Sequence, residues 1–166
     1  MAARLAVAGA AALALGAGVA VVADSPAGGP DYAAPGVPWS AIDPTGKGRL
    51  DPAARARMVK AAAQVEAFRV WLGVSQLRIS PHGGYQPHPS PPGWPDRNPT
   101  SQHKLGSATD LYPPEGWGLA KFHAKAQEFM AKRGGGLGFY TWGCHLDTRP
   151  SSKLVTWGSP KPEAFA

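Results

Sequence analysis

The sequence predicts an α+β domain, and three observations lead to this class. The chain has 166 residues, and glycine (21) and proline (18) together make up nearly a quarter of it, which favours short elements joined by many loops. Two segments carry apolar residues at helical spacing. Several short segments have the alternation or composition of strands. We therefore expect two helices packed against a small, mostly antiparallel sheet.

Residues 1–23 differ in composition from the rest of the chain, because Arg4 is their only charged residue. A basic start followed by an apolar run that ends in Val21 and Ala23 predicts a cleaved secretory signal peptide. An uncleaved membrane anchor is the alternative, since the run approaches the ~20 residues that span a bilayer. Both alternatives predict export to the periplasm, the cell wall or the extracellular space, and only the anchor would attach the chain to a membrane.

The rest of the chain divides by composition into three parts. Residues 24–50 are rich in proline and glycine and predict a linker, residues 51–158 carry the periodic segments of one domain, and residues 159–166 form a short tail.

The first helix is expected between Asp51 and Gly73. Asp51 is suited to the N-cap, Pro52 to the first helical position and Gly73 to the C-terminal end. Apolar residues recur at steps of three and four, as expected for one buried face: Met58, Ala62, Val65, Phe68 and Leu72.

The remaining elements follow from alternation, glycine and proline. A proline-dense loop is expected over 81–100 and a second helix over Leu119–Lys132, which Gly134 ends. Strands are expected at 76–80, at 107–112, in a hairpin formed by 134–140 and 144–148, and at 154–157.

Charge and cysteine content limit the classes of function. The formal net charge of +6 favours anionic surroundings such as wall polymers, but the cations are spread out and form no cluster typical of nucleic-acid binding. We expect a monomer with no nucleic-acid partner. The single cysteine, Cys144, excludes an internal disulfide, and a metal ion is one substitute for such a cross-link.

Four polar residues suggest chemistry. His103 and Asp110 are seven residues apart and can converge only if the chain turns between them, which Gly106 permits. On a strand, His145 and Asp147 share one face, and this places Cys144 on the other face, in the core. Two histidines and an aspartate could hold a catalytic zinc ion with an open fourth position, although other divalent ions also accept these ligands. Solvated polar residues without a metal remain the alternative.

Two motifs carry a resemblance to a known family. The segment 101–110 matches Ser-x-His-x-x-Gly-x-Ala-x-Asp, and the segment 135–147 matches Gly-Gly-x-Gly-x-Tyr followed by His-x-Asp. Together with the helix before them, these motifs resemble the zinc D-alanyl-D-alanine carboxypeptidase and murein endopeptidase family over residues 50–158. The fold of that family is shared with vancomycin-resistance dipeptidases and the Hedgehog signalling domain.

The resemblance implies a zinc site and a role for several residues. His103, Asp110 and His145 would be the zinc ligands. Asp147 would be the general base or would orient a ligand, because Trp142 stands at the position, three residues before the last ligand, where several branches carry a Glu or Asp. Glu115 is a weaker candidate for the base. The residues that would contact substrate are Ser101, Tyr85, Gln86, Arg97 and Tyr140, and Gln86 stands where the family usually has an arginine.

The implied function is zinc-dependent hydrolysis of peptide bonds in the stem peptides of peptidoglycan. The departure at Gln86 and the unassigned base leave two alternatives open. The chain could be a peptidoglycan-binding module that does not cut, or a structural module of a virion or envelope with the same fold.

Overall fold

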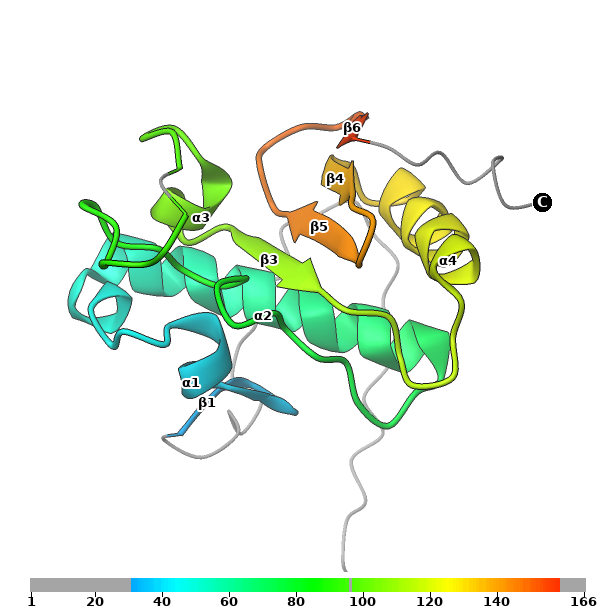
Figure 1. Ribbon diagram of the computed structural model, residues 1–166, viewed down its shortest axis with the longest axis horizontal. Helices are drawn as coiled ribbons and strands as arrows, with labels where there is room; N and C mark the ends of the chain where they lie inside the picture. The colour runs from blue at the N-terminus through cyan, green and yellow to red at the C-terminus, as the bar shows by residue number, and fades with distance from the viewer. Residues whose placement is uncertain (1–30, 96, 159–166) are drawn as a thin grey trace, which may run out of the picture.

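The computed structural model describes residues 31–95 and 97–158 (Figure 1). The expected signal peptide or anchor, residues 24–30 of the expected linker and the tail 159–166 lie outside the described residues. Among the helices of the described part, none has the length and apolar character needed to cross a membrane.

Helix α2 (Pro52–Leu72) confirms the first predicted helix together with both of its caps. A carboxylate oxygen of Asp51 accepts a hydrogen bond of 2.8 Å from the backbone N–H of Ala53, which satisfies one free donor of the first turn. Gly73 ends the helix in the left-handed conformation with φ 68°, which glycine adopts without steric cost. The predicted apolar face is buried, except that Leu72 is only partly covered.

Helix α4 (Leu119–Ala131) confirms the second predicted helix and packs against α2. Phe68 of α2 lies between two aromatic rings of α4, with ring centroids 5.8 Å from Phe122 and 4.8 Å from Phe129. All three side chains are fully buried, so the contact between the two helices forms the centre of the core.

The sheet has the strand order β3-β5-β4-β6, and this arrangement confirms the α+β class. Its strands are β3 (Ala108–Leu111), β5 (Cys144–Asp147), β4 (Gly135–Phe139) and β6 (Leu154–Gly158). The first three pair antiparallel, which confirms the predicted hairpin, whereas β6 runs parallel to β4. Figure 1 shows α2 passing behind β3, so the helices cover one face of the sheet.

Alternation along β3 and β5 separates two kinds of side chain. Leu111 is paired with Cys144, and both belong to the core beneath the helices. Cys144 is fully buried, as predicted, and burial raises the pKa of its thiol well above the usual value. The next pair in the register, Asp110 with His145, therefore points to the opposite face.

The domain begins earlier than the sequence indicated, because residues 31–50 are not a linker over their whole length. They form β1 (Tyr32–Ala34), β2 (Val37–Pro38), α1 (Trp39–Ile42) and the short 3-10 helix η1 (Gly48–Leu50). Trp39 and Ile42 join the hydrophobic core. The proline and glycine content suggested a linker. The apolar side chains between the prolines and glycines, however, pack against the core of the domain.

One further expectation was wrong. Residues 76–80 form no strand, and only Ile79 makes a single bridge with Leu111. His123 of α4 is fully buried, and its Nε2 lies 2.8 Å from the carbonyl oxygen of Gly143. That partner is 20 residues away along the chain, and its proximity depends on how α4 packs on the hairpin.

Candidate metal centre

We call the face of the sheet opposite α2 and α4 the open face. His103 reaches it from a short helix, α3 (Gln102–Leu105), that precedes β3. Gly106 ends this helix with φ 81° and turns the chain into the strand that carries Asp110. The turn expected between His103 and Asp110 is therefore present, although His103 lies on a helical turn and not on an irregular loop.

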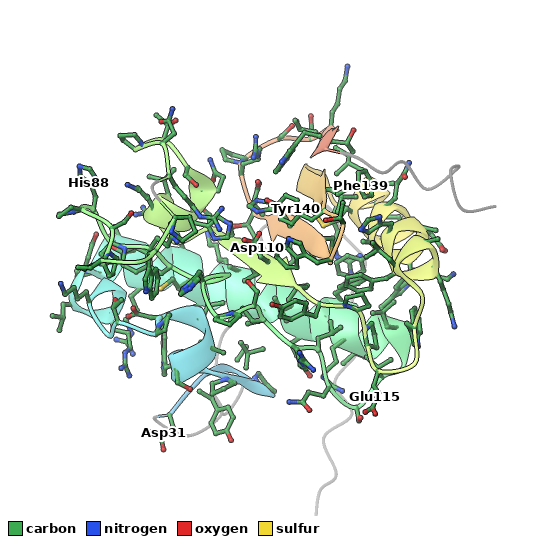
Figure 2. All side chains as sticks on the ribbon, in the orientation of Figure 1. Asp31, His88, Asp110, Glu115, Phe139 and Tyr140 are labelled. Atoms are coloured by element: carbon green, nitrogen blue, oxygen red, sulfur yellow. The ribbon has the colours of Figure 1, made fainter. Side chains whose placement is uncertain are left out.

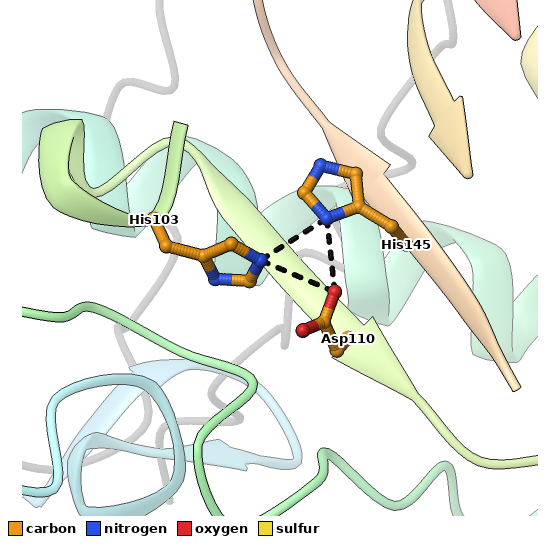
Figure 3. Close-up of side chains that lie close together, drawn as sticks. All are labelled: His103, Asp110 and His145. Atoms are coloured by element: carbon orange, nitrogen blue, oxygen red, sulfur yellow. Dashed lines mark hydrogen bonds and ion pairs between the residues drawn. The ribbon is translucent and has the colours of Figure 1, made fainter. Parts of the chain in front are cut away.

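Three donor atoms meet on this face (Figure 3). Oδ1 of Asp110 lies 3.2 Å from Nε2 of His103 and 2.9 Å from Nδ1 of His145. The two ring nitrogens are 3.1 Å apart. All three side chains are buried, so residues far apart in the sequence form one compact group.

Hydrogen bonds on the outer side of each ring determine which nitrogen carries the proton. Nδ1 of His103 lies 2.9 Å from the carbonyl oxygen of Gly84, which can only accept, so Nδ1 is the donor. Nε2 of His145 lies 3.1 Å from a carboxylate oxygen of Asp147 and donates to it in the same way. In the neutral rings, the two lone pairs therefore point toward each other and toward Asp110.

This arrangement fits a metal ion. Two lone pairs and a carboxylate oxygen repel one another unless a cation or a shared proton lies between them. Ligand atoms about 2.0–2.1 Å from a tetrahedral zinc ion are about 3.3 Å apart, close to the three distances of 2.9–3.2 Å in the cluster. Two nitrogens and one oxygen suit zinc, and they also suit other divalent ions.

The pKa values of the cluster reflect burial and the mutual hydrogen bonds. Burial lowers the pKa of His103, and its bond to Asp110 opposes this only in part. Burial also acts to lower the pKa of His145, but the hydrogen bonds to Asp110 and Asp147 outweigh it and raise the pKa. Burial would raise the pKa of Asp110, yet the bonds from both histidines hold it well below the usual range. Asp110 is therefore ionised at neutral pH.

Two arginines support the cluster from outside. Nη2 of Arg97 donates to Oδ2 of Asp110 over 2.9 Å, which leaves Oδ1 facing the histidines. Nε of Arg149 lies 2.8 and 3.0 Å from the two carboxylate oxygens of Asp147. The guanidinium of Arg149 also lies 5.0 Å from the ring centre of Trp157, and that ring packs on His145. Outer contacts of this kind fix the orientation of metal ligands.

Asp147 occupies the position of an orienting residue. Its side chain is fully buried, lies on the outer side of the His145 ring and has both oxygens bound by Arg149. Of the two roles predicted for Asp147, the orienting role agrees with these contacts. The role of general base does not, because neither oxygen is free to accept a proton from water. Glu115 lies at the periphery of the molecule, away from Asp110 (Figure 2).

A pocket of about 230 Å³ opens beside the cluster. Three of the predicted substrate contacts, Ser101, Arg97 and Tyr140, line it together with both histidines. Figure 2 shows Tyr140 close to Asp110. Burial, and next the negative charge of Asp110, raise the pKa of Tyr140 to about 12, so its phenol is neutral and can donate a hydrogen bond.

The other two predicted contacts do not line this pocket. Tyr85 turns toward η1, where its ring leaves no space for a side chain at Gly48. Gln86 is fully buried, and neither its amide nitrogen nor its amide oxygen has a hydrogen-bond partner. The backbone N–H of Gln86 donates to the carbonyl oxygen of His103, so Gln86 is held directly beside a residue of the cluster.

Sequence reasoning missed Arg149 and Trp157, which also line the pocket. A signal existed for Arg149, because it follows Asp147 by two residues and alternation places both on one side of the chain. No comparable signal existed for Trp157. It stands opposite Gly138 only because β6 pairs parallel with β4, and a side chain at Gly138 would collide with its ring.

The comparisons with known proteins do not identify a family. No protein-family model, curated protein or solved structure matches the chain. The resemblance to zinc peptidases therefore rests on the two sequence motifs and stays a prediction.

Proposed function

We propose that this chain is a zinc-dependent peptidase that hydrolyses peptide bonds in peptidoglycan stem peptides. One observation carries the proposal: two histidines and an aspartate converge beside an open pocket, with their outer atoms held by hydrogen bonds. Three protein ligands and one open position are typical of catalytic zinc, whereas structural zinc sites are closed by four protein ligands.

The residues around the pocket have distinct parts in this proposal. When bound, zinc would lower the pKa of a water molecule and polarise the scissile carbonyl. The neutral phenol of Tyr140 can donate to an oxygen that gains charge during the reaction. The charges of Arg97 and Arg149 offset those of Asp110 and Asp147, so a bound zinc ion would make the pocket positive, which suits the carboxylates of wall peptides. Asp147 holds the His145 ring so that Nδ1 faces the cluster.

The proposal extends to where the chain acts. A secretory signal or anchor at residues 1–23 would bring the domain to the compartment that contains peptidoglycan. The basic net charge would favour contact with wall polymers that carry carboxylates and phosphates.

The first test measures zinc and hydrolysis in the same preparations. We expect about one zinc per purified wild-type chain and cleavage of cross-linked muropeptides, read by mass spectrometry of the products. His145→Ala should lose both. His88→Ala is the matched control, because His88 is exposed and lies away from the cluster (Figure 2), and it should retain both. Wild-type chain that takes up no zinc when the metal is supplied would contradict the proposal.

A second candidate function is a peptidoglycan-binding module that does not cut. One observation favours it: among the described residues that line the pocket, none carries a free carboxylate that could act as a general base. Zinc binding without release of any peptide product would support this candidate. Loss of wall binding on removal of zinc would then separate it from a purely structural module.

A further inference from the structure

Three aromatic rings form a row next to the metal cluster that the proposed function does not use. The ring of Trp142 lies 5.1 Å from that of Tyr140 and 5.2 Å from that of Tyr112, measured between centroids. Trp142 is 41% exposed, one of the most exposed large apolar side chains among the described residues. We call Tyr112, Trp142 and Tyr140 the aromatic row.

The register of the sheet places the two tyrosines of the aromatic row on the same face as the cluster. Tyr112 follows Asp110 by two residues, and Tyr140 follows Gly138, the partner of His145, by two residues. Alternation therefore puts both tyrosines on the open face, one step along the strands from the candidate ligands. The hydrophobic core lies on the other face, so packing of the core does not account for these rings.

The aromatic row also joins two hollows of the surface. Tyr140 lines the pocket beside His103 and His145. At the other end of the row, Tyr112 lines a second pocket of about 420 Å³ together with Arg78. The guanidinium of Arg78 lies 5.1 Å from the ring centre of Tyr112. A ligand that contacts the whole row would therefore extend well beyond a single peptide bond.

We propose that the aromatic row binds the glycan strand that carries the stem peptide. This inference rests on the proposed function, since it assigns the row to another part of the same substrate. Sugar rings have flat C–H faces that stack on aromatic rings and hydroxyl edges that suit phenols, and the row combines one indole with two phenols. Arg78 supplies positive charge at the Tyr112 end of the row, which favours sugars that bear carboxylates over neutral ones.

The chemistry of the row argues against an apolar peptide as its ligand. Two of the three rings carry a hydroxyl group, which suits a ligand rich in hydroxyl groups better than an apolar side chain. A peptide partner is nevertheless a distinct outcome of the experiment below.

The experiment measures glycan binding separately from cleavage. Two probes are titrated into the purified wild-type chain by calorimetry: peptide-free glycan strands from peptidoglycan, whose muramic acid units carry carboxylates, and neutral chitohexaose. We expect tighter binding of the acidic strands. Trp142→Ala should weaken that binding by about fivefold to tenfold, the effect of losing one stacked ring. Tyr32→Ala, which removes a similarly exposed ring from β1, should have no effect.

Further measurements keep the inference apart from the proposed function. Trp142→Ala should retain its zinc and should cleave a stem peptide without glycan at the wild-type rate, which also shows that it folds. Arg78→Gln should reduce the preference for the acidic strands over chitohexaose.

Equal glycan affinity of Trp142→Ala and wild type, or no glycan binding by the wild type, would overturn the inference. Slower cleavage of the free peptide by Trp142→Ala would assign the row to peptide and overturn it as well. Failure of the wild type to cleave any peptide would instead count against the proposed function.

Discussion

The two faces of the four-stranded sheet differ in what their side chains require. On the covered face, Leu111, Cys144 and Leu146 need only a well-packed apolar layer, which α2 and α4 supply. On the open face, Asp110 and His145 are the neighbours of Leu111 and Cys144 in the same strands. Burial of these two polar side chains is favourable only if each polar atom has a hydrogen-bonding or ionic partner. The comparison teaches that alternation along a few residues can separate the part of the chain that holds the fold from the part suited to chemistry.

The largest effect is expected from removing a large side chain of the apolar layer that covers the sheet. Phe68→Ala should lower the free energy of unfolding by about 3–5 kcal/mol, because it leaves a cavity between the two helices. His103→Ala on the open face should cost much less when a chelator is present, since the cluster then holds no cation. Urea unfolding of both variants with and without zinc provides the measurement. Equal losses in the metal-free chains would contradict the division between the faces.

A smaller effect is expected at the outer contacts of the cluster. Asp147→Asn keeps the size of the side chain but weakens the bond that keeps the proton on Nε2 of His145. Zinc affinity should fall about 10- to 100-fold, the usual cost of losing such a support. Competition with a chromophoric chelator measures the affinity. Asp51→Asn, which retains a capping side chain at the start of α2, is the control and should bind zinc like wild type.

Acidification should cause two separate losses, first of zinc and then of the folded structure. Zinc should leave first, because both histidines must be neutral to bind it and the hydrogen bonds of His145 to Asp110 and Asp147 raise its pKa, so that acid protonates this ring early. Asp110 and Asp147 have pKa values lowered in the folded chain, so their contribution to stability is present above pH ~4, the unfolded value, and is lost as the pH falls further. A zinc-sensitive dye and circular dichroism followed in one titration should therefore report two steps. A single step in which zinc and secondary structure are lost together would show that the fold depends on the bound zinc.

Much of the fold could be predicted because local signals agreed with one another. Helix α2 has a capping aspartate, a proline at the first position and a glycine at the end, and all three act within a few residues. The hairpin of β4 and β5 likewise follows from nearby glycines and alternation. The elements of residues 31–50 were missed because they are two to four residues long and gain their stability from packing on α2.

The residues of the candidate site also fall into two groups, those that local sequence signals predict and those that only the fold brings into place. His103, Asp110 and His145 could be predicted as candidate metal ligands because their spacing and the two motifs that contain them can be read directly from the sequence. Trp157 could not be predicted. It reaches the pocket because β6 pairs parallel with β4, and no sequence pattern indicates the path of the connection that makes this pairing possible. The contacts that agree with an orienting role for Asp147, with Arg149 on both of its oxygens, are visible only in the structure.

The burial of Cys144 has a practical consequence for a chain that is expected to leave the cytoplasm. A thiol with no exposed surface and a raised pKa forms almost no thiolate, so oxidants and other thiols have nothing to attack. The folded domain should tolerate an oxidising compartment without a reductant and without forming disulfide-linked dimers. Only a chain that unfolds would expose the sulfur, and covalent dimers on a non-reducing gel would then record the fraction that had lost its fold.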